Sequence, residues 1–518
     1  MCGIVGLKGE FKADTILSMM KITESRGMDS HGIYLKNEEN IIYNNNFKLS
    51  DFNVDKNTYN IGIGHNLLSI FNFYNEDEFL NFQPIKYNNL ILSFNGEIYN
   101  YKEVLNFLKS NLYDGQSPKS DSELLVKLLY YYYNKDYNLL DAVEHTNRII
   151  DGDYAYSVFD GVNIAVTRDK IGVKPLFYGE YNGLQAFASE KKALWKINIK
   201  DKIKSLKPGF ILYNFREYPP KDLIYGYVSS QHHKYETYKK KLDTLLNKSV
   251  KDRIKNVDDI ALIFSGGVDS TLLLYYILDN LNEKQNLTLY TVSNNDSQDL
   301  KHACKVAKSL NQKLKVSLID EDTVRHYLDK TLLAIEEANL MKLGVGMTIF
   351  IASHMIFEDN IKVALSGQGA DELFAGYNRY RNTYELGYTG KDGLKYKRFK
   401  AVECELRHDI ENIYDVNLQR DDAVSMANGV ELRVPFLSEE LVKWSLNIPA
   451  KYKIKNAEDN IRKNILRDLA SDKGIPDYIA YRNKKAAQYG SGIDKILRKK
   501  IFKDLDINQY YNKLIETI

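Results

Sequence analysis

Hydrophobic and polar residues follow two different patterns along the chain. Through about the first 200 residues, short runs of apolar, β-branched and aromatic residues end at Gly, Asn or Asp, as strands do. They predict strands over residues 89–101, 151–161 and 163–170. Residues 120–133 instead repeat apolar side chains at three- and four-residue intervals, which predicts a helix. Strands interleaved with a few helices favour packing in layers over a closed barrel.

Beyond residue 235 the pattern becomes an alternation of helices and continuously apolar strands. Strands that are apolar on both faces indicate a parallel sheet covered by helices on both sides. The expected elements are helices over 238–254 and 268–278 and strands over 260–264, 287–292 and 361–365.

A segment with neither pattern separates the two regions. Residues 211–235 contain Pro219–Pro220 and no hydrophobic period, so they predict a linker. The sequence therefore predicts a fold of the α/β and α+β classes with two domains, at residues 1–210 and 236–518. A length of 518 residues is ample for two domains with cores of their own.

Composition narrows the class of protein. Lys+Arg 71 against Asp+Glu 69 leaves a net charge of +2, which argues against general nucleic-acid binding. Hydrophobic content of 44 % with 27 % charged residues is typical of a soluble globular protein. The absence of an 18-residue apolar run and of a secretory signal argues against a membrane span and secretion. Cys2, Cys304 and Cys404 are too few for a disulfide framework, which favours a reducing cytoplasmic compartment.

Cys2 is the first residue that suggests catalysis. A lone cysteine is more often a small buried hydrophobe than a nucleophile. Its place as the second residue changes this interpretation, because removal of Met1 would leave a free α-amine beside the thiol. An α-amine, with a pKa of about 8, can act as the general base for its own side chain. Cys2 alone would then supply both nucleophile and base.

A thiolate that attacks an amide also needs donors for the charge that develops on oxygen. Asn95 and Gly96, in SFNGEIYN, offer a side-chain amide and a backbone N–H where a predicted strand ends. Alone this pair would indicate only a turn. It occurs, however, together with MCGIVG at the start of the chain, RGMDSHGIY at 26–34, SDSE at 120–123 and RDKIGVKPLFY at 168–178.

With these motifs the chain resembles the class II glutamine amidotransferases, and among them the glutamine-hydrolysing asparagine synthetases. The resemblance implies an N-terminal αββα sandwich of the N-terminal-nucleophile hydrolase type. It implies that Cys2 is the glutaminase nucleophile and that Asn95 and Gly96 form the oxyanion hole. Glu97 and Asp121 would hold the amino end of the substrate glutamine.

One position departs from that family. The segment that matches GHNLLSI at 64–70 normally carries an Arg for the glutamine carboxylate, and here the position is Leu67. A guanidinium binds a carboxylate through two directed hydrogen bonds, which leucine cannot replace. Either another cation binds the carboxylate, with Arg26 as a candidate, or glutamine is bound weakly. Met28, where the family often has Pro, is a smaller departure.

The sequence SGGVDS lies between a predicted strand and a predicted helix. Glycines allow the backbone to approach an anion, and a helix N-terminus presents unpaired N–H groups to it. The segment lacks the Gly-Lys-Ser/Thr ending of a Walker A loop, and alone it could be an ordinary turn. The residues it offers to a phosphate are Ser265, Gly266, Gly267, Asp269 and Ser270.

A second turn of the same kind follows in SGQGADE at 366–372. Two such turns on one parallel sheet lie at the same carboxyl edge, where open α/β sheets bind their ligands. Asp269 and Asp371 would bring two carboxylates to that edge. Such carboxylates, together with phosphate oxygens, suit Mg²⁺.

The SGGVDS loop also resembles the pyrophosphate loop of adenylating enzymes, which implies a C-terminal parallel-sheet α/β domain of the ATP-pyrophosphatase type. The likeness to asparagine synthetases extends to SMANGVELRVPFL at 425–437. By this resemblance the ATP site also contains Phe264, Val292, Ser366 and Gly367. Gln368 replaces a Glu common in the family, which removes a charge near the polyphosphate.

Two further residues receive a catalytic role only from the resemblance. Glu336 matches the Glu expected to act as base when ammonia attacks the acyl-adenylate, with Glu337 as the competing position. Lys484 matches the lysine that stabilises charge on the adenylate and on pyrophosphate, with Lys485 as its competitor.

The resemblance implies ATP-dependent conversion of aspartate to asparagine through β-aspartyl-AMP, with glutamine as nitrogen donor and AMP, pyrophosphate and glutamate as products. The expected partners are glutamine, aspartate, ATP and Mg²⁺, and relatives of this family are often homodimers. Three alternatives stay open. The acceptor could be another carboxylate, since Asn339 stands where an Asp is common. The enzyme could depend on free ammonia if its glutaminase site is impaired, or the chain could be a non-catalytic relative.

Overall fold

The computed structural model describes residues 2–70, 82–111, 117–135, 138–222, 233–483 and 492–516. The chain forms two compact units, one consisting mainly of Met1–Leu223 and the other of Ile224–Ser425 and Val430–Ile515. The boundary between the units falls inside the range expected as a linker.

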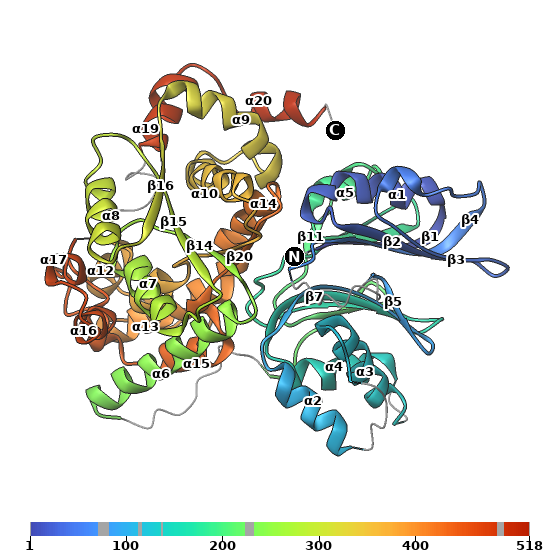
Figure 1. Cartoon of the computed structure of the whole chain (residues 1–518), viewed down its shortest axis with the longest axis horizontal. Coiled ribbons are helices and arrows are strands. Elements are labelled where there is room, and N and C mark those ends of the chain that lie inside the picture. Colours follow the sequence, from blue (N-terminus) through green and yellow to red (C-terminus); the bar gives the residue numbers. More distant parts are fainter. Residues whose placement is uncertain are drawn as a thin grey trace. The chain divides into compact units, whose positions relative to one another are not determined.

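The N-terminal unit is built from two antiparallel sheets. Figure 1 shows them face to face, with α1 and α5 on the outer side of one sheet and α2, α3 and α4 on the outer side of the other. In spatial order the seven-stranded sheet contains β11 (Lys204–Ser205), β9 (Phe177–Tyr181), β10 (Leu184–Ala188), β1 (Gly3–Lys12), β4 (Thr58–Leu67), β2 (Ser30–Lys36) and β3 (Ile41–Asn46). The six-stranded sheet contains β13 (Arg216–Tyr218), β12 (Ile211–Tyr213), β8 (Ile164–Arg168), β7 (Gly152–Phe159), β6 (Leu90–Ile98) and β5 (Ile85–Tyr87). The helices are α1 (Ala13–Ile22), α2 (Tyr101–Ser110), α3 (Asp121–Tyr133), α4 (Leu139–Ile149) and α5 (Lys191–Trp195).

Three apolar layers hold this unit together. One lies between the seven-stranded sheet and α1 with α5, for example Ile16 and Leu194 against Leu7. A second fills the space between the sheets, and a third packs α2, α3 and α4 on the six-stranded sheet. Central strands such as β2, β6 and β7 bury both faces because both sheets are covered on both sides. The predicted αββα sandwich is confirmed.

The first part of the expected linker is strand. Ile211–Tyr213 pairs with β8, and Arg216–Tyr218 pairs with Ile211–Tyr213 in a short hairpin at the sheet edge. Two three-residue strands are too short to give a hydrophobic period, so the sequence pattern did not reveal them. Pro219–Pro220 follows the last of these strands.

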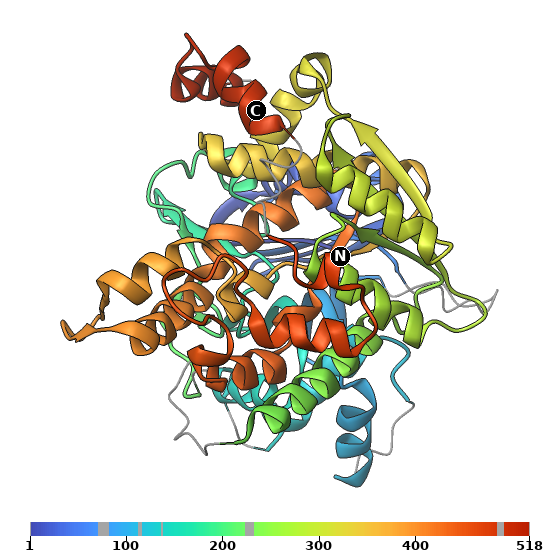
Figure 2. The same cartoon turned by 90° about the vertical axis from the view of Figure 1, so that its left-hand side faces the viewer.

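The second unit has a parallel five-stranded sheet in the order β16 (Lys313–Leu318), β15 (Asn286–Ser293), β14 (Asp259–Ile263), β17 (Val363–Leu365) and β20 (Glu431–Arg433). Figure 1 shows α8 (Gln298–Ser309) and α10 (Leu340–Glu358) on opposite sides of it. In Figure 2 the yellow α9 (Glu321–Ile335) lies at the top of this unit and the green α6 (Tyr235–Ile254) at the bottom. The other elements are α7 (Val268–Asn280), α11 (Ala370–Phe374), α12 (Arg379–Leu386), the pair β18 (Tyr388–Thr389) and β19 (Lys395–Tyr396), α13 (Arg398–Ile413), α14 (Gln419–Met426), α15 (Glu439–Asn447), α16 (Asn464–Asp472), α17 (Asp477–Ala480), α19 (Ile493–Ile496) and α20 (Ile507–Ile515). The predicted parallel-sheet domain is confirmed.

By length and composition α10 alone, among the described residues, could cross a membrane, with a mean hydropathy of 1.6 over its most apolar window. That window is 61 % buried inside the structure, as in the core helix of a soluble protein. The helix packs against α9 and the parallel sheet, which accounts for its apolar composition.

Candidate functional site

The first group of predicted site residues joins the two sheets of the N-terminal unit. Cys2 directly precedes β1 and is 5 % exposed. Its backbone nitrogen donates a hydrogen bond of 2.8 Å to Asn95 Oδ1 on β6. The amide nitrogen Nδ2 of Asn95 is buried and has no hydrogen-bond partner among the described residues. The predicted nucleophile therefore has an unused amide donor beside it.

The neighbouring positions are fixed by close packing at the end of β6. A Cβ on Gly96 would lie 2.4 Å from the backbone oxygen of Asp153 on β7, so the two strands can approach here only because this residue is glycine. Glu97 is buried, and the next residue, Ile98, donates its N–H to Asp121 Oδ2 at 2.7 Å. This bond brings the first residue of α3 to the end of β6, as the sequence prediction for Glu97 and Asp121 requires.

Arg26 is used inside the fold. Its Nε donates to the backbone oxygen of Cys2 at 3.1 Å, and its Nη1 forms a fully buried ion pair with Glu190 at 3.1 Å. Lys192 approaches the same carboxylate at 2.8 Å, and although burial opposes it, these two cations lower the pKa of Glu190. The observed contacts of Arg26 thus hold the main chain of Cys2. Leu67, at the end of β4, is a buried apolar residue.

Sequence reasoning missed a buried polar contact that also joins the sheets. His65 on β4 is fully buried, and its Nδ1 lies 2.8 Å from Ser93 Oγ on β6, two residues before Asn95. Burial, with smaller contributions from the chain's amino terminus and His31, lowers the pKa of His65 to about 3. This histidine is therefore neutral at physiological pH. A lone histidine in a strand gives no sequence signal for such a role.

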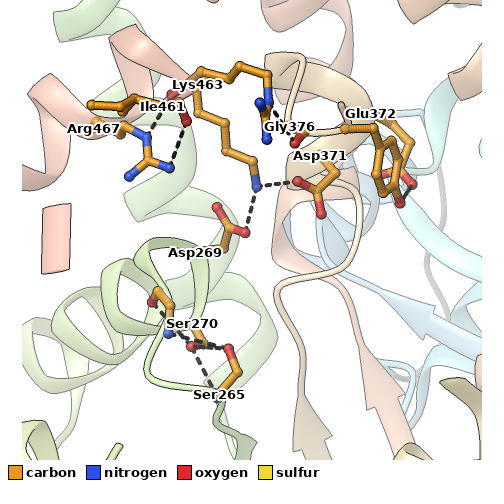
Figure 3. A network of polar contacts seen from close by, with 12 residues as sticks. Ser265, Asp269, Ser270, Asp371, Glu372, Gly376, Ile461, Lys463 and Arg467 are labelled. Carbon is orange, nitrogen blue, oxygen red and sulfur yellow. Dashed lines mark hydrogen bonds and ion pairs between the residues drawn. The ribbon is translucent and has the colours of Figure 1, made fainter. Parts of the chain in front are cut away.

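The second group of predicted site residues lies at the carboxyl edge of the parallel sheet. Ser265 follows β14 and Phe264, and its hydroxyl lies 3.2 Å from Ser270 Oγ and accepts the N–H of Gly267 at 3.3 Å (Figure 3). Gly267 caps α7, so Asp269 and Ser270 stand in its first turn. Gly266 has φ +66, and a Cβ there would lie 2.7 Å from the backbone of Ala303 on α8. The turn is thus a compact loop at a helix N-terminus.

The two phosphate-type turns are adjacent in space. β14 and β17 pair directly, with Leu262 opposite Leu365. A Cβ on Gly367 would lie 3.2 Å from Cβ of Asp269, so the second turn packs on the first. Three further residues were predicted at this edge. Phe264 forms hydrogen bonds with Tyr290 and Thr291 of β15, and Val292 is the next residue of that strand. Ser366 donates its N–H to the backbone oxygen of Arg433.

A lysine that the sequence did not single out lies between the two predicted carboxylates. Lys463 Nζ is 2.6 Å from Asp269 Oδ2 and 2.6 Å from Asp371 Oδ1, and its side chain is 1 % exposed (Figure 3). The adjacent Glu372 instead accepts hydrogen bonds from Tyr377 and Asn417. The structure thus distinguishes the two acidic residues of the second turn, because only Asp371 pairs with the lysine.

Gly376 makes this contact possible. A Cβ at this position would lie 1.8 Å from Asp371 Oδ1 and 2.2 Å from Cε of Lys463.

Over the described residues no group of three or more His, Cys, Asp or Glu side chains is arranged to hold a metal ion. The two carboxylates are therefore a partial donor set, which phosphate oxygens of a ligand would have to complete.

Of the residues whose role came only from the resemblance, the structure describes Glu336 and Glu337 but not Lys484 and Lys485. Glu336 ends α9 in a left-handed conformation with φ +56 and is buried. Glu337 pairs with Lys342 Nζ at 2.5 Å and accepts a hydrogen bond from Asn339 at 3.1 Å. Its side chain is 38 % exposed, whereas Glu336 is 7 % exposed. The left-handed conformation is a common one for a residue that ends a helix. Lys484 and Lys485 lie outside the described residues.

The chain is similar to known proteins over its whole length. The sequence family described as asparagine synthase matches residues 241–392 and 393–509, and the one described as glutamine amidotransferase domain matches residues 50–229. A Methanocaldococcus jannaschii protein, provisionally named a glutamine-hydrolysing asparagine synthetase, is 38 % identical over 575 aligned positions that cover 99 % of this chain and 98 % of that protein. The Bos taurus glutamine-hydrolysing asparagine synthetase is 27 % identical, over 81 % and 76 % respectively. Among solved structures, the glutamine phosphoribosylpyrophosphate amidotransferase of B. subtilis is 17 % identical over 61 % of this chain and 65 % of that chain, with a TM-score of 0.35.

Proposed function

Because the chain belongs to the glutamine-hydrolysing asparagine synthetase family, it is an enzyme that amidates aspartate with ATP and glutamine, and we propose how its residues divide this work. The N-terminal unit releases ammonia from glutamine. The second unit activates aspartate with ATP and joins the ammonia to it. The main support for placing the ATP reaction in the second unit is that Asp269 and Asp371, from two adjacent phosphate-type turns, both contact Lys463 Nζ.

In the glutaminase reaction Cys2, once Met1 is removed, attacks the carboxamide carbon of glutamine through Sγ. Its own α-amine takes the thiol proton. Asn95 Oδ1 already accepts a hydrogen bond from this nitrogen, which supports a fixed position for the amine. Asn95 Nδ2 and the Gly96 N–H donate to the oxyanion, ammonia leaves, and water releases glutamate from the thioester.

The amino end of glutamine is held by Glu97 and Asp121, whose carboxylates attract its ammonium group. For its carboxylate, the contacts of Arg26 with Cys2 and Glu190 support a positioning role for Arg26 in place of direct substrate binding. With Leu67 at the family's arginine position, we expect glutamine to bind more weakly than a directly paired carboxylate would.

In the synthetase reaction a carboxylate oxygen of aspartate attacks the α-phosphorus of ATP and pyrophosphate leaves. The turn residues Ser265, Gly266, Gly267 and Ser270 and the second turn at Ser366 and Gly367 line the phosphates, and Phe264 and Val292 contact the nucleoside. Asp269 Oδ1 is buried without a hydrogen-bond partner among the described residues, which fits a cation ligand. Mg²⁺ held by Asp269 and Asp371 would neutralise polyphosphate charge when bound.

Ammonia then attacks the carbonyl carbon of the acyl-adenylate, AMP leaves, and Glu336 accepts the surplus proton. The burial of Glu336 beside the more exposed Glu337 supports its selection. Lys484 is proposed to stabilise the charge on the adenylate and pyrophosphate.

The test is one reaction with purified protein, Mg²⁺-ATP, glutamine and aspartate, analysed by mass spectrometry for asparagine, glutamate and AMP. We expect the three products to rise in equal amounts. Glutamate without AMP or asparagine would contradict aspartate as the acceptor, and AMP only after addition of ammonium would contradict a working glutaminase. Absence of AMP with every acceptor tested would contradict catalysis altogether.

The three cysteines, Cys2, Cys304 and Cys404, are all free thiols, which supports a reducing cytoplasmic compartment. We also propose that the partners of this enzyme are its small-molecule substrates and that it binds neither nucleic acid nor a membrane. A homodimer is the state expected from relatives, and sedimentation velocity would test it.

A further inference from the structure

The proposed ATP site contains a cation of its own, Lys463, between Asp269 and Asp371. Lys463 is almost completely buried, while the side chains of Asp269 and Asp371 are 20 % and 18 % exposed. Its ammonium lies 2.6 Å from one oxygen of each carboxylate. It therefore occupies the position between the carboxylates where a divalent cation would bind.

An unusual backbone turn before α16 holds Lys463 between the two carboxylates. Arg462 and Lys463 both have left-handed φ angles, +53 and +54, in the turn that starts α16. Two successive non-glycine residues in this region are strained and persist only when neighbouring contacts impose them. Here Arg467 donates to the backbone oxygens of Arg462 at 2.6 Å and of Ile461 at 2.9 Å (Figure 3). Asp459 Oδ1 accepts the N–H groups of Ile461 and Arg462.

We propose that Lys463 is an exchangeable counter-ion: it neutralises Asp269 and Asp371 in the nucleotide-free enzyme and moves to the polyphosphate when the metal–nucleotide complex binds. This proposal rests on the proposed ATP site. A divalent cation and an ammonium compete for the same two carboxylate oxygens. The negative phosphates of ATP give the ammonium a new partner, so the exchange becomes favourable only when metal and nucleotide arrive together.

The exchange predicts a specific binding behaviour. A divalent cation alone must displace a buried ammonium whose ion pairs, among the described residues, are with these two carboxylates, so it binds weakly. Removal of the lysine charge leaves two uncompensated carboxylates, which attract the cation more strongly. The same removal deprives the nucleotide of one cation. Loss of Lys463 should therefore change metal-only affinity and metal–nucleotide affinity in opposite directions, whereas a lysine that serves only to stabilise the fold would not strengthen metal binding.

The experiment measures Mn²⁺ binding by electron paramagnetic resonance on the full chain without nucleotide. We expect Lys463→Met and Lys463→Gln to bind Mn²⁺ about tenfold or more tightly than the unsubstituted protein. Lys463→Gln keeps a hydrogen-bond donor, and it serves if the methionine variant does not fold. Lys315→Met is the matched control, because it removes a lysine–aspartate pair with Asp359 at the edge strand β16, and it should leave Mn²⁺ affinity unchanged.

A second measurement uses Mn²⁺ with a non-hydrolysable ATP analogue, for which the neutral variants should bind about tenfold or more weakly. Thermal unfolding adds a readout for any destabilised variant, since Mg²⁺ alone should raise the Tm of the Lys463 variants and not that of the unsubstituted protein. Unchanged or weaker nucleotide-free Mn²⁺ binding by a folded Lys463 variant would overturn the exchange. If the unsubstituted protein fails to bind the metal–analogue complex, the proposed ATP site itself is wrong.

Discussion

The two proposed active sites of this chain differ in how charge is balanced before the substrates bind. Around Cys2 the polar groups that touch the nucleophile are neutral or already neutralised, with Asn95 on one side and the buried Arg26–Glu190 pair on the other. Around Asp269 the site consists of unlike charges held together by Lys463. The first site needs no rearrangement of charge to accept a zwitterionic amino acid, whereas the second must exchange ions before it can accept ATP.

This contrast follows from the substrates. Glutamine is a zwitterion and changes the net charge of its site little, so a fixed arrangement of polar groups can be built into a sandwich core. ATP with its metal brings several charges at once, and an uncompensated pair of carboxylates would be costly while the site waits for them. A resident lysine removes that cost in the nucleotide-free state.

The strongest test of this division is to remove the nucleophile. Cys2→Ala should lower glutamine-dependent asparagine formation at least about a thousandfold, because no other group replaces the thiol. Ammonia-dependent formation should remain within about twofold, since the second site is intact. Both rates come from one coupled assay with glutamine or ammonium chloride. Loss of both rates in a folded variant would contradict the separation of the half-reactions.

The converse change is Asp371→Asn, which keeps the shape of the side chain and removes its charge. We expect ATP-dependent AMP formation to fall about a hundredfold or more with either nitrogen donor, because one cation ligand and one partner of Lys463 are lost. Glutamate release by the N-terminal unit should persist. Glu372→Gln provides the comparison, since Glu372 bonds to Tyr377 and Asn417, and a larger loss there would show that the wrong carboxylate was chosen.

Gly376→Ala tests whether the spacing of the charges matters. The added methyl would meet Asp371 Oδ1 and Cε of Lys463 at distances no real contact allows. We expect AMP formation to fall roughly tenfold to a hundredfold through misplacement alone. The measurement is the AMP rate beside the circular dichroism spectrum of the folded variant. An unchanged rate would mean that the Asp371–Lys463 contact is dispensable.

Arg26→Lys separates positioning from substrate binding in the N-terminal unit. If Arg26 holds Cys2, the glutaminase kcat should fall about tenfold with KM for glutamine nearly constant. If Arg26 binds the glutamine carboxylate, KM should rise instead. Steady-state glutamate production over a range of glutamine concentrations distinguishes the two, and Lys192→Met is the control for loss of the second cation beside Glu190.

The smallest effect concerns acid stability. Burial holds the pKa of His65 at about 3, below its ordinary 6.5, so below pH 6.5 the unfolded chain binds a proton that the folded chain does not. The stability that neutral His65 permits is present above pH 6.5 and is lost as pH falls toward 3. His65→Asn should flatten the decline of the unfolding midpoint between about pH 6.5 and 4. Parallel curves for the two proteins would contradict this assignment.

The second unit contains a comparable group in a different pH window. Burial lowers the pKa of Lys453 from 10.5 to about 7, and its Nζ donates to the backbone oxygen of Ser445. The unfolded chain keeps this proton up to about pH 10.5, so the stability of the folded form decreases as pH falls from 10.5 to 7. Unfolding followed over both windows would therefore report on the two units in turn.

Local sequence patterns predicted most of the fold, and they pointed only to those candidate site residues that lie in short motifs. β14 and β17 could be predicted because a buried strand and the Ser-Gly turn after it each depend on the identity of a few neighbouring residues. Lys463 left no such signal, since it meets Asp269 across 194 positions of sequence and stands in a run that resembles a solvated helix face. The same limit hid the contact of Arg26 with Cys2, which made Arg26 available in the sequence interpretation as a ligand for glutamine.

The strand order of the second unit also bears on the order in which the proposed ATP site is assembled during synthesis. β17 inserts between β14 and β20, and Lys463 follows all three in the chain. A nascent chain that ends before this lysine can form both acidic turns but lacks the cation that balances them. Because contacts so distant in sequence form late, the proposed ATP site gains its counter-ion only after residue 463 has been synthesised and has folded against the two acidic turns. The ion pair thus makes assembly of this site a late step in the folding of the second unit.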